Sequence, residues 1–240
     1  MKGYFKKKGE KIMTKRFGFT LAEVLITLGI IGVVAAMTMP TLMNSTQGAQ
    51  YKSAYKKALS ALGQAITLNV ALDGGNFYDA IAGSGTNATT DQSTAGTIAN
   101  ILSARMNVVN ASNTRTDGVT PAYATDVTAT LPTVNTYLYF NDGAMLAFDG
   151  KDAACTLVTD AGATAKVCLG YIDVNGSKGP NKVVTCNTAS ETAATFSGTG
   201  KVDNVAACEV SNPTDIYPVA LYDQTVMPAT NAANAVLYGK

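Results

Sequence analysis

The longest pattern along the chain is an uncharged, mostly apolar run that begins just after a basic start. No charged residue lies between Glu23 and Lys52, and residues 24–43 are about the length that a helix needs to cross a bilayer. Because the basic residues precede this run, we expect the N-terminus to stay on the cytoplasmic side and the remainder to be exported.

The apolar run continues into a segment with helical periodicity. In residues 51–72 the apolar positions recur at steps of three and four, and lysines lie off that stripe; the stripe comprises Tyr51, Tyr55, Ala58, Leu62, Ala65, Ile66 and Val70. The pattern predicts one helix over residues 19–72, with a membrane anchor at about 21–43 and an amphipathic second half that packs on a globular part. Asp73-Gly74-Gly75 is expected to end it.

Residues 73–135 are weakly patterned and are expected to form a variable connection. Their central part is rich in Gly, Ser, Thr and Asn, which is typical of loops. The spacing of Ile98, Ile101, Leu102 and Met106 predicts one short helix near residues 96–109.

Strand patterns dominate residues 136–240. The stretch TYLYF-NDG-AMLAF is apolar and aromatic on both sides of Asn141-Asp142-Gly143, which predicts a hairpin. The stretch ACTLV-TDAGAT-AKVCLGYIDV predicts a second hairpin, and a turn between Ala161 and Gly162 would place Cys155 opposite Cys168. The expected fold class is therefore α+β, with a long N-terminal helix on a small antiparallel sheet.

The four cysteines all lie in the last third of the chain. None belongs to a C-x-x-C pair, which argues against a zinc site, and an even number beyond a membrane segment indicates disulfides rather than four free thiols. Opposed residues of an antiparallel pair lie within disulfide range, so we predict Cys155–Cys168 and, from the remaining two cysteines, Cys186–Cys208.

Charge and composition argue against an enzyme and against broad nucleic-acid binding. The net charge of +1 combines a basic leader, residues 1–18, with a mildly acidic body, so no basic surface for nucleic acid is expected. The chain has no histidine and no G-x-S-x-G, P-loop or dinucleotide fingerprint. No catalytic residue is predicted.

The stretch G-F-T-L-A-E-V-L-I-T-L-G-I-I-G-V-V-A-A resembles the N-terminal signal of type IV prepilins and type II secretion pseudopilins. The resemblance covers Lys15 to Pro40 and implies a pilin-like fold. It also implies that a prepilin peptidase cleaves after Gly18 and that Phe19 is then N-methylated. The family's assembly glutamate falls on Glu23, and its helix-bending proline falls on Pro40.

That resemblance implies a filament subunit that self-assembles through its N-terminal helix with inner-membrane assembly machinery. Before assembly, the subunit would be a single-pass protein of the cytoplasmic (inner) membrane, and afterwards part of an extracellular or periplasmic filament. A Glu23 carboxylate buried among packed anchors needs a partner, and the amine of a neighbouring Phe19 is the expected one. The alternative is a minor pilin that serves as a membrane-anchored adhesin or a receptor for DNA or a surface. Translation from Met1 or from Met13 would leave the same cleavage position.

One loop carries a possible calcium site. Asp173-x-Asn175-Gly176 resembles the start of a calcium loop, and the surrounding stretch is similar to the C-terminal loop of G-type major pseudopilins, some of which bind calcium. Asp215 is the nearest further carboxylate that the resemblance offers as a ligand. The alternative is a structural Asn175-Gly176 turn followed by a bend at Gly179-Pro180.

Overall fold

A computed structural model provides the structure of the chain. It describes residues 18–73, 98–122, 131–132, 134–148, 168–187, 195–196, 202–203, 208–222 and 225–239. The chain divides into two compact units, residues 1–43 and 44–240, and each unit is described by itself.

The first unit contains the beginning of α1 (Leu21–Asp73), the helix predicted from the sequence. Its large apolar side chains up to Met43 are exposed, and Pro40 lies inside the helix. Proline has no N–H, so the carbonyl of Ala36 lacks its usual partner four residues on. The hydroxyls of Thr27 and Thr38 donate to the carbonyls of Val24 and Val34, each at 3.0 Å, so these polar groups are paired within the apolar helix itself.

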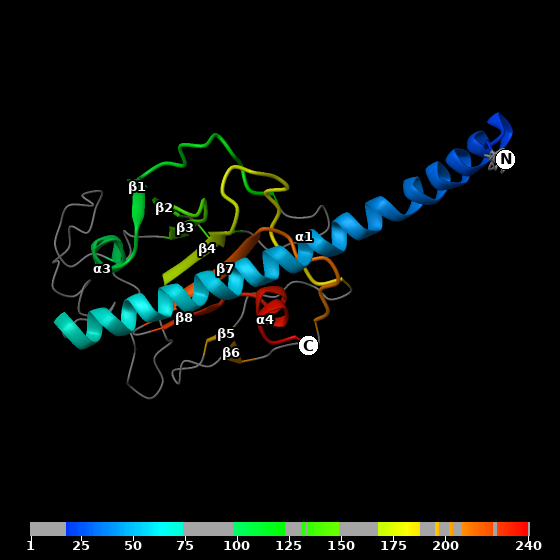
Figure 1. The fold of residues 1–240 in the computed structure, drawn as a ribbon. Coiled ribbons are helices and arrows are strands. Elements are labelled where there is room, and N and C mark those ends of the chain that lie inside the picture. The colour runs from blue at the N-terminus through cyan, green and yellow to red at the C-terminus, as the bar shows by residue number, and fades with distance from the viewer. Residues whose placement is uncertain are drawn as a thin grey trace, which may run out of the picture. The chain divides into compact units, whose positions relative to one another are not determined.

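The second unit is built on one six-stranded antiparallel sheet (Figure 1). Its strands lie in the order β1 (Val108–Ser112), β2 (Thr136–Phe140), β3 (Met145–Phe148), β4 (Cys168–Asp173), β7 (Ile216–Tyr222) and β8 (Thr225–Pro228). Two short strands, β5 (Thr195–Phe196) and β6 (Val202–Asp203), pair separately. The other helices are α3 (Ile98–Arg105) and α4 (Asn231–Tyr238).

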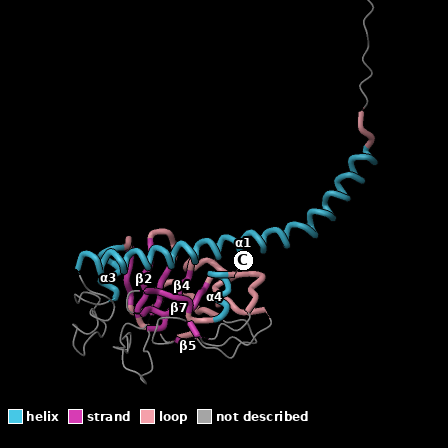
Figure 2. The backbone as a smooth tube through the Cα atoms, turned by 90° about the horizontal axis from the view of Figure 1, so that it is seen from below, coloured by secondary structure: helices cyan, strands magenta, loops and turns pink. Residues whose placement is uncertain are grey.

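The second half of α1 lies across one face of this sheet, as Figure 2 shows. Side chains alternate between the two faces of a strand, and those that meet the helix form the main core. Among them are Tyr55, Leu62 and Ile66 of α1, and Leu138, Leu146, Phe148, Ile172, Tyr217, Val219 and Leu221 of the sheet. The rings of Tyr55 and Tyr217 stack with centroids 4.0 Å apart and planes inclined by 8°, and this contact joins the helix to β7.

The opposite face of the sheet carries the alternate residues of the same strands. Met145, Ala147, Tyr171 and Ile216 are buried there together with Val183, which lies beyond the sheet. The chain covers this face with the connection after β1 and the segment after β4, which meet at a parallel bridge between residues 122 and 182. Both faces of the sheet are therefore buried over this region.

Three side-chain contacts fix the ends of the elements in the second unit. The hydroxyl of Thr230 caps α4 by accepting from the N–H of Ala233, and Lys52 of α1 donates to the carbonyl of Gly239 at the other end of α4, at 3.0 Å. On the surface, Lys57 pairs with Asp142 of the β2–β3 turn at 3.0 Å. Exposed pairs of this kind contribute little stability, so the apolar core carries most of the packing energy.

The fold class predicted from the sequence is confirmed: a long apolar N-terminal helix accompanies an antiparallel sheet. The hairpin around Asn141-Asp142-Gly143 is present as β2 and β3. The helix expected near residues 96–109 is shorter, because Val108 and Val109 belong to β1, which pairs with β2. That pairing is with a strand about 30 residues away, and helical spacing alone does not reveal it.

The first arm and the turn predicted for the second hairpin lie outside the described residues, so its register stays a prediction. Within β4, Gly170 lies opposite Phe148 of β3. A β-carbon on Gly170 would collide with the carbonyl oxygen of Ala147, so glycine permits this close strand approach. Since β3 and β7 occupy both edges of β4, no hairpin partner can pair along residues 170–173.

We predict that Leu62→Ala destabilises the second unit by about 3 kcal/mol, because it leaves a cavity between α1 and the sheet. Leu62 is 1% exposed. Leu72→Ala on the same helix is the matched control, since Leu72 is 66% exposed and its loss should cost less than about 0.5 kcal/mol. Urea unfolding of the full chain in detergent, followed by near-UV circular dichroism of the tyrosines, measures both. Equal losses would contradict this account of the core.

Candidate functional site

The start of α1 is organised by two side chains that bond each other's backbone. The N–H of Glu23 donates to the hydroxyl of Thr20 at 3.2 Å, while the N–H of Thr20 donates to Oε2 of Glu23 at 3.2 Å. The Thr20 hydroxyl also donates to Oε2 at 3.2 Å. This reciprocal T-x-x-E arrangement is a capping box, which satisfies two backbone donors that a helix start otherwise leaves open.

The capping box offsets part of the free-energy cost of placing a carboxylate at the edge of an apolar helix. Glu23 lies in the first helical turn, where the positive end of the helix dipole stabilises negative charge. Both of its bonds to Thr20 use Oε2, and within the described part of the chain no hydrogen bond reaches Oε1. The exposed carboxylate can therefore cap its own helix and still accept a partner from another chain.

The residues around the box present a large apolar surface. Phe19 and Leu21 are 87% and 80% exposed, and the large apolar side chains of residues 24–43 are also exposed. This stretch is long and apolar enough to cross a membrane, with a mean hydropathy of 2.2. Apolar surface of this extent is covered by lipid or by other protein in a stable assembly.

A family model described as the prokaryotic N-terminal methylation motif matches residues 13–39. The chain carries this methylation motif. It covers Gly18, Phe19, the capping box and the start of the exposed apolar stretch, and it is consistent with the signal of prepilins and pseudopilins. It supports a processed subunit of pilin or pseudopilin type, which is not an enzyme, and it is compatible with membrane anchoring. No curated protein and no solved structure matches the chain.

The described part of the methylation motif is one continuous segment that leads into α1. Gly18 and Phe19 precede the helix and are exposed, and a β-carbon at Gly18 would meet no atom within 4 Å. Open backbone of this kind, immediately before an ordered helix, is accessible to a peptidase. Pro40 lies on the same helix beyond the matched residues.

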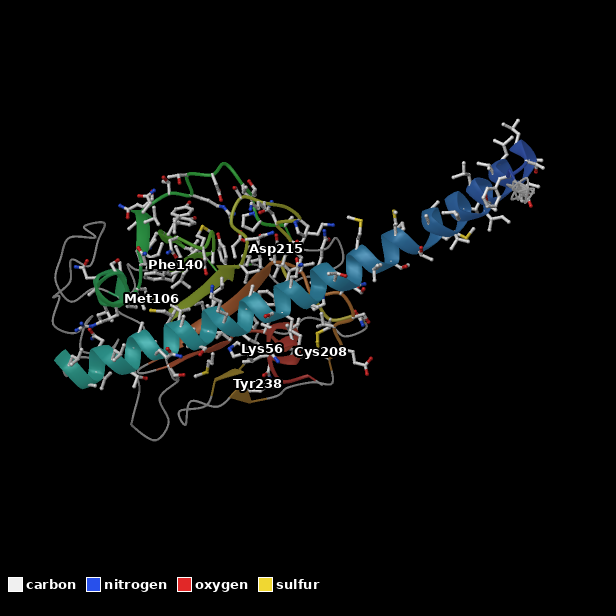
Figure 3. All side chains as sticks on the ribbon, viewed as in Figure 1. Lys56, Met106, Phe140, Cys208, Asp215 and Tyr238 are labelled. Atoms are coloured by element: carbon white, nitrogen blue, oxygen red, sulfur yellow. A yellow bond between two sulfur atoms is a disulfide. The ribbon has the colours of Figure 1, made fainter. Side chains whose placement is uncertain are left out.

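The three residues proposed for calcium form a second cluster, at the C-terminal end of β4 and in the loops next to it. Asp173 and Asp215 are both 0% exposed, and the N–H of Val174 donates to the carbonyl of Asp215 at 3.0 Å. Asp215 accepts from the N–H groups of Asn181 and Lys182 at 2.7 and 2.9 Å. Asp173 accepts through Oδ1 from the N–H of Gly176 at 2.9 Å. Figure 3 labels Asp215 among the side chains of this region.

Sequence patterns do not predict the cation that lies in this cluster. Arg115, from the connection after β1, donates to Oδ2 of Asp173 at 2.8 Å and to Oδ1 of Asp117 at 2.6 Å. Its side chain is 7% exposed. An Arg-x-Asp pair in a polar loop is usually solvated, and only the folding of that loop over the sheet buries it here.

Burial determines the electrostatics of the cluster. It raises the pKa of Asp173 to about 6 and outweighs the hydrogen bond and charge of Arg115, which act in the opposite direction; the charge of Asp215 adds to the rise. Arg115 holds the pKa of Asp117 below its ordinary value despite partial burial. The same two carboxylates raise the pKa of Arg115 further, so the arginine stays charged.

The geometry of these residues argues both for and against calcium, and the calcium site stays a prediction. Calcium takes six to eight oxygens, and among the described residues no three His, Cys, Asp or Glu side chains gather around one point. The Oδ1 atoms of Asn175 and Asn181 are buried without a hydrogen-bond partner, which favours an ion. Against it, a guanidinium already contacts Asp173 and would repel a dication.

The disulfide Cys186–Cys208 is present, with Cα atoms 5.4 Å apart. It joins the segment after β4 to the segment before β7, and Figure 3 labels Cys208. Cys168 is also disulfide-bonded, and its predicted partner, Cys155, lies outside the described residues.

A cleft of about 340 Å³ lies beside the second half of α1. It is lined mainly by apolar side chains, including Leu62, Ala65, Met106, Phe140 and Leu146, and its lining also includes Lys57 and Asp142. Met106 and Phe140 are labelled in Figure 3. Sequence patterns do not reveal this cleft, because its walls come from five elements, α1, α3, β2, β3 and β4.

We predict that unfolding becomes easier as pH rises from about 4 to 7, by up to about 3 kcal/mol from Asp173. Its pKa is raised by folding, so the native state holds the proton more tightly and the stabilisation is lost through the folded pKa of about 6. Folding lowers the pKa values of Asp117 and Asp142. These two groups therefore change the stability only below about pH 4, where stability falls as the pH falls. Asp173→Asn should remove the slope above pH 4 in urea unfolding, and an unchanged slope in this variant would contradict the assignment.

Proposed function

We propose that the chain is a structural filament subunit that is cleaved after Gly18, methylated at Phe19 and polymerised through α1. The observation that carries this proposal is the methylation motif at residues 13–39, which includes the start of a helix that exposes its apolar side chains. Cleavage after Gly18 removes the basic leader and keeps the apolar helix. The membrane holds this helix first, and packing against the same helices of neighbouring subunits then replaces the lipid.

In this proposal, Glu23 sets the axial position of each subunit relative to its neighbours. Cleavage creates a free amine at Phe19, and Oε1 of Glu23 accepts no bond from the described part of its own chain. In a water-poor bundle a carboxylate and an amine from different subunits stabilise each other, and an unpaired charge would be very unfavourable. One charged pair per subunit therefore selects one axial offset, as a single buried polar residue does in coiled coils.

The presence of Glu23 favours a subunit within the filament shaft over a minor adhesin or receptor. A subunit at the tip of a filament has no neighbour above it to pair with this carboxylate, whereas a shaft subunit has one. A shaft subunit dominates the protein in sheared surface filaments, and a minor pilin does not. Whether the filament is a type IV pilus or a secretion pseudopilus is tested by visualising long surface fibres on wild-type cells.

Processing is tested by Gly18→Val. A β-branched residue at the cut should block the peptidase, so the uncleaved leader stays on the chain and Phe19 stays unmethylated. Intact-mass measurement of the membrane-extracted protein should show a mature wild-type chain that begins at Phe19 and carries one extra methyl group. A Gly18→Val protein with the same mature N-terminus would contradict cleavage at this position.

Assembly is tested by comparing Glu23→Gln with Glu23→Ala. Glutamine keeps the capping box, because its amide oxygen also accepts from the N–H of Thr20, but it removes the charge. We expect both variants to be cleaved and membrane-bound and to lose at least ~10-fold of sheared filaments, since a missing buried ion pair costs more than 1.4 kcal/mol.

Thr20→Val is the matched control for helix capping. It removes the hydroxyl but keeps the carboxylate, and it should weaken the helix start by about 1 kcal/mol while filaments still form. Normal filaments from Glu23→Gln together with loss from Thr20→Val would show that capping, and not charge, is what assembly needs. That outcome would overturn the pairing with Phe19.

A further inference from the structure

Two segments far apart in the sequence meet at Arg115. The arginine itself belongs to the connection after β1, Asp173 ends β4, and Gly176 lies in the turn that follows. Arg115 Nη2 donates to Oδ2 of Asp173 at 2.8 Å and approaches the carbonyl of Gly176 at 3.5 Å, while Nε donates to Asp117. One guanidinium therefore donates to two carboxylates, through Nε and Nη2, and lies near a backbone carbonyl.

The loop that contacts Arg115 folds tightly around a carboxylate, as a metal-binding loop does. Gly176 has φ of +63°, and a β-carbon there would meet the carbonyl oxygen of Gly143, so the turn is tightly held. Oδ1 of Asp173 accepts from the N–H groups of Asn175 and Gly176 at 3.3 and 2.9 Å. The loop thus bends around a carboxylate, and the positive charge that this carboxylate contacts is the guanidinium.

We infer that Arg115 is the built-in cation of this loop cluster and takes the role that a divalent ion would have there. Its positive charge stabilises the carboxylates of Asp117 and Asp173. Its two donor nitrogens also hold the connection after β1, which covers the sheet face opposite α1, onto the end of β4. A tethered cation has an effective concentration that does not depend on the surroundings. The second unit should therefore keep its stability whether or not calcium is present.

The inference is independent of filament formation, since it concerns only contacts within residues 44–240. It also explains why Asp173 can lie fully buried beside Asp215, whose charge opposes its ionisation. Without the guanidinium, an ionised Asp173 would be an uncompensated buried charge. Lysine would not replace it, because an ammonium lacks the planar fork that bridges two carboxylates.

The test uses the full-length chain in detergent at pH 7.5, with thermal unfolding followed by near-UV circular dichroism. Wild type is measured in 5 mM calcium chloride and in 5 mM chelator, each in roughly thousandfold excess over the protein. A ligand that binds only the native state must raise Tm in the first condition. We expect the same Tm in both. We expect Arg115→Met to lower Tm by roughly 10 °C, and Arg115→Met with Asp173→Asn to recover more than half of that fall.

Lys57→Met is the matched control, because it removes a surface ion pair of 3.0 Å and should shift Tm by less than about 2 °C. A wild-type Tm several degrees higher in calcium would overturn the inference, as would an Arg115→Met protein as stable as wild type. If Arg115→Met does not fold, the double variant decides: a folded double variant supports the charge-balancing role, and an unfolded one contradicts it.

Discussion

The contact between the second half of α1 and one face of the sheet is the interaction on which the described parts of the second unit depend. The sheet alone would leave Leu138, Leu146 and Ile172 in water, and the helix covers them with Leu62 and Ile66. The stacked rings of Tyr55 and Tyr217 fix where the helix crosses β7. Burial of these side chains is worth about 1.5–3 kcal/mol for each large residue, which exceeds the contribution of surface ion pairs such as Lys57–Asp142.

A single helix has to satisfy two different environments, and its sequence changes character accordingly. Residues 21–43 are apolar around the whole circumference, and their threonine hydroxyls bond to the helix's own carbonyls. After Lys52 most of the large apolar side chains lie on a stripe that faces the sheet, whereas Leu68 and Leu72 are exposed. The first part must be covered by lipid or by other protein, and the stripe is covered within its own chain, so the proposed polymerisation need not disturb the fold of residues 44–240.

Local signals in the sequence were sufficient for the helix, for the β2–β3 hairpin and for the segment that carries the methylation motif. Each depends on residues close together in the chain: a three- and four-residue period, an Asn141-Asp142-Gly143 turn, and the run from Gly18 to Glu23. The placement of β1 beside β2 and of β4 between β3 and β7 depends on partners far along the chain, which local patterns do not reveal. Arg115 could not be predicted, because its burial arises only when the loop after β1 folds over the sheet.

The two acidic sites show why one carboxylate is open to another chain and the other is not. Asp173 is fully buried, its oxygens accept from Arg115 and from the turn that follows it, and a further cation would have to displace a charge that is already in contact. Glu23 is exposed, and its two bonds to Thr20 use one oxygen. A carboxylate satisfied inside its own fold stabilises that fold, whereas one that remains half-satisfied on an apolar helix gains most when a second subunit brings the missing charge. The difference in partners, rather than the presence of an acid, is what separates the structural charge of Asp173 from that of Glu23, for which we propose the assembly role.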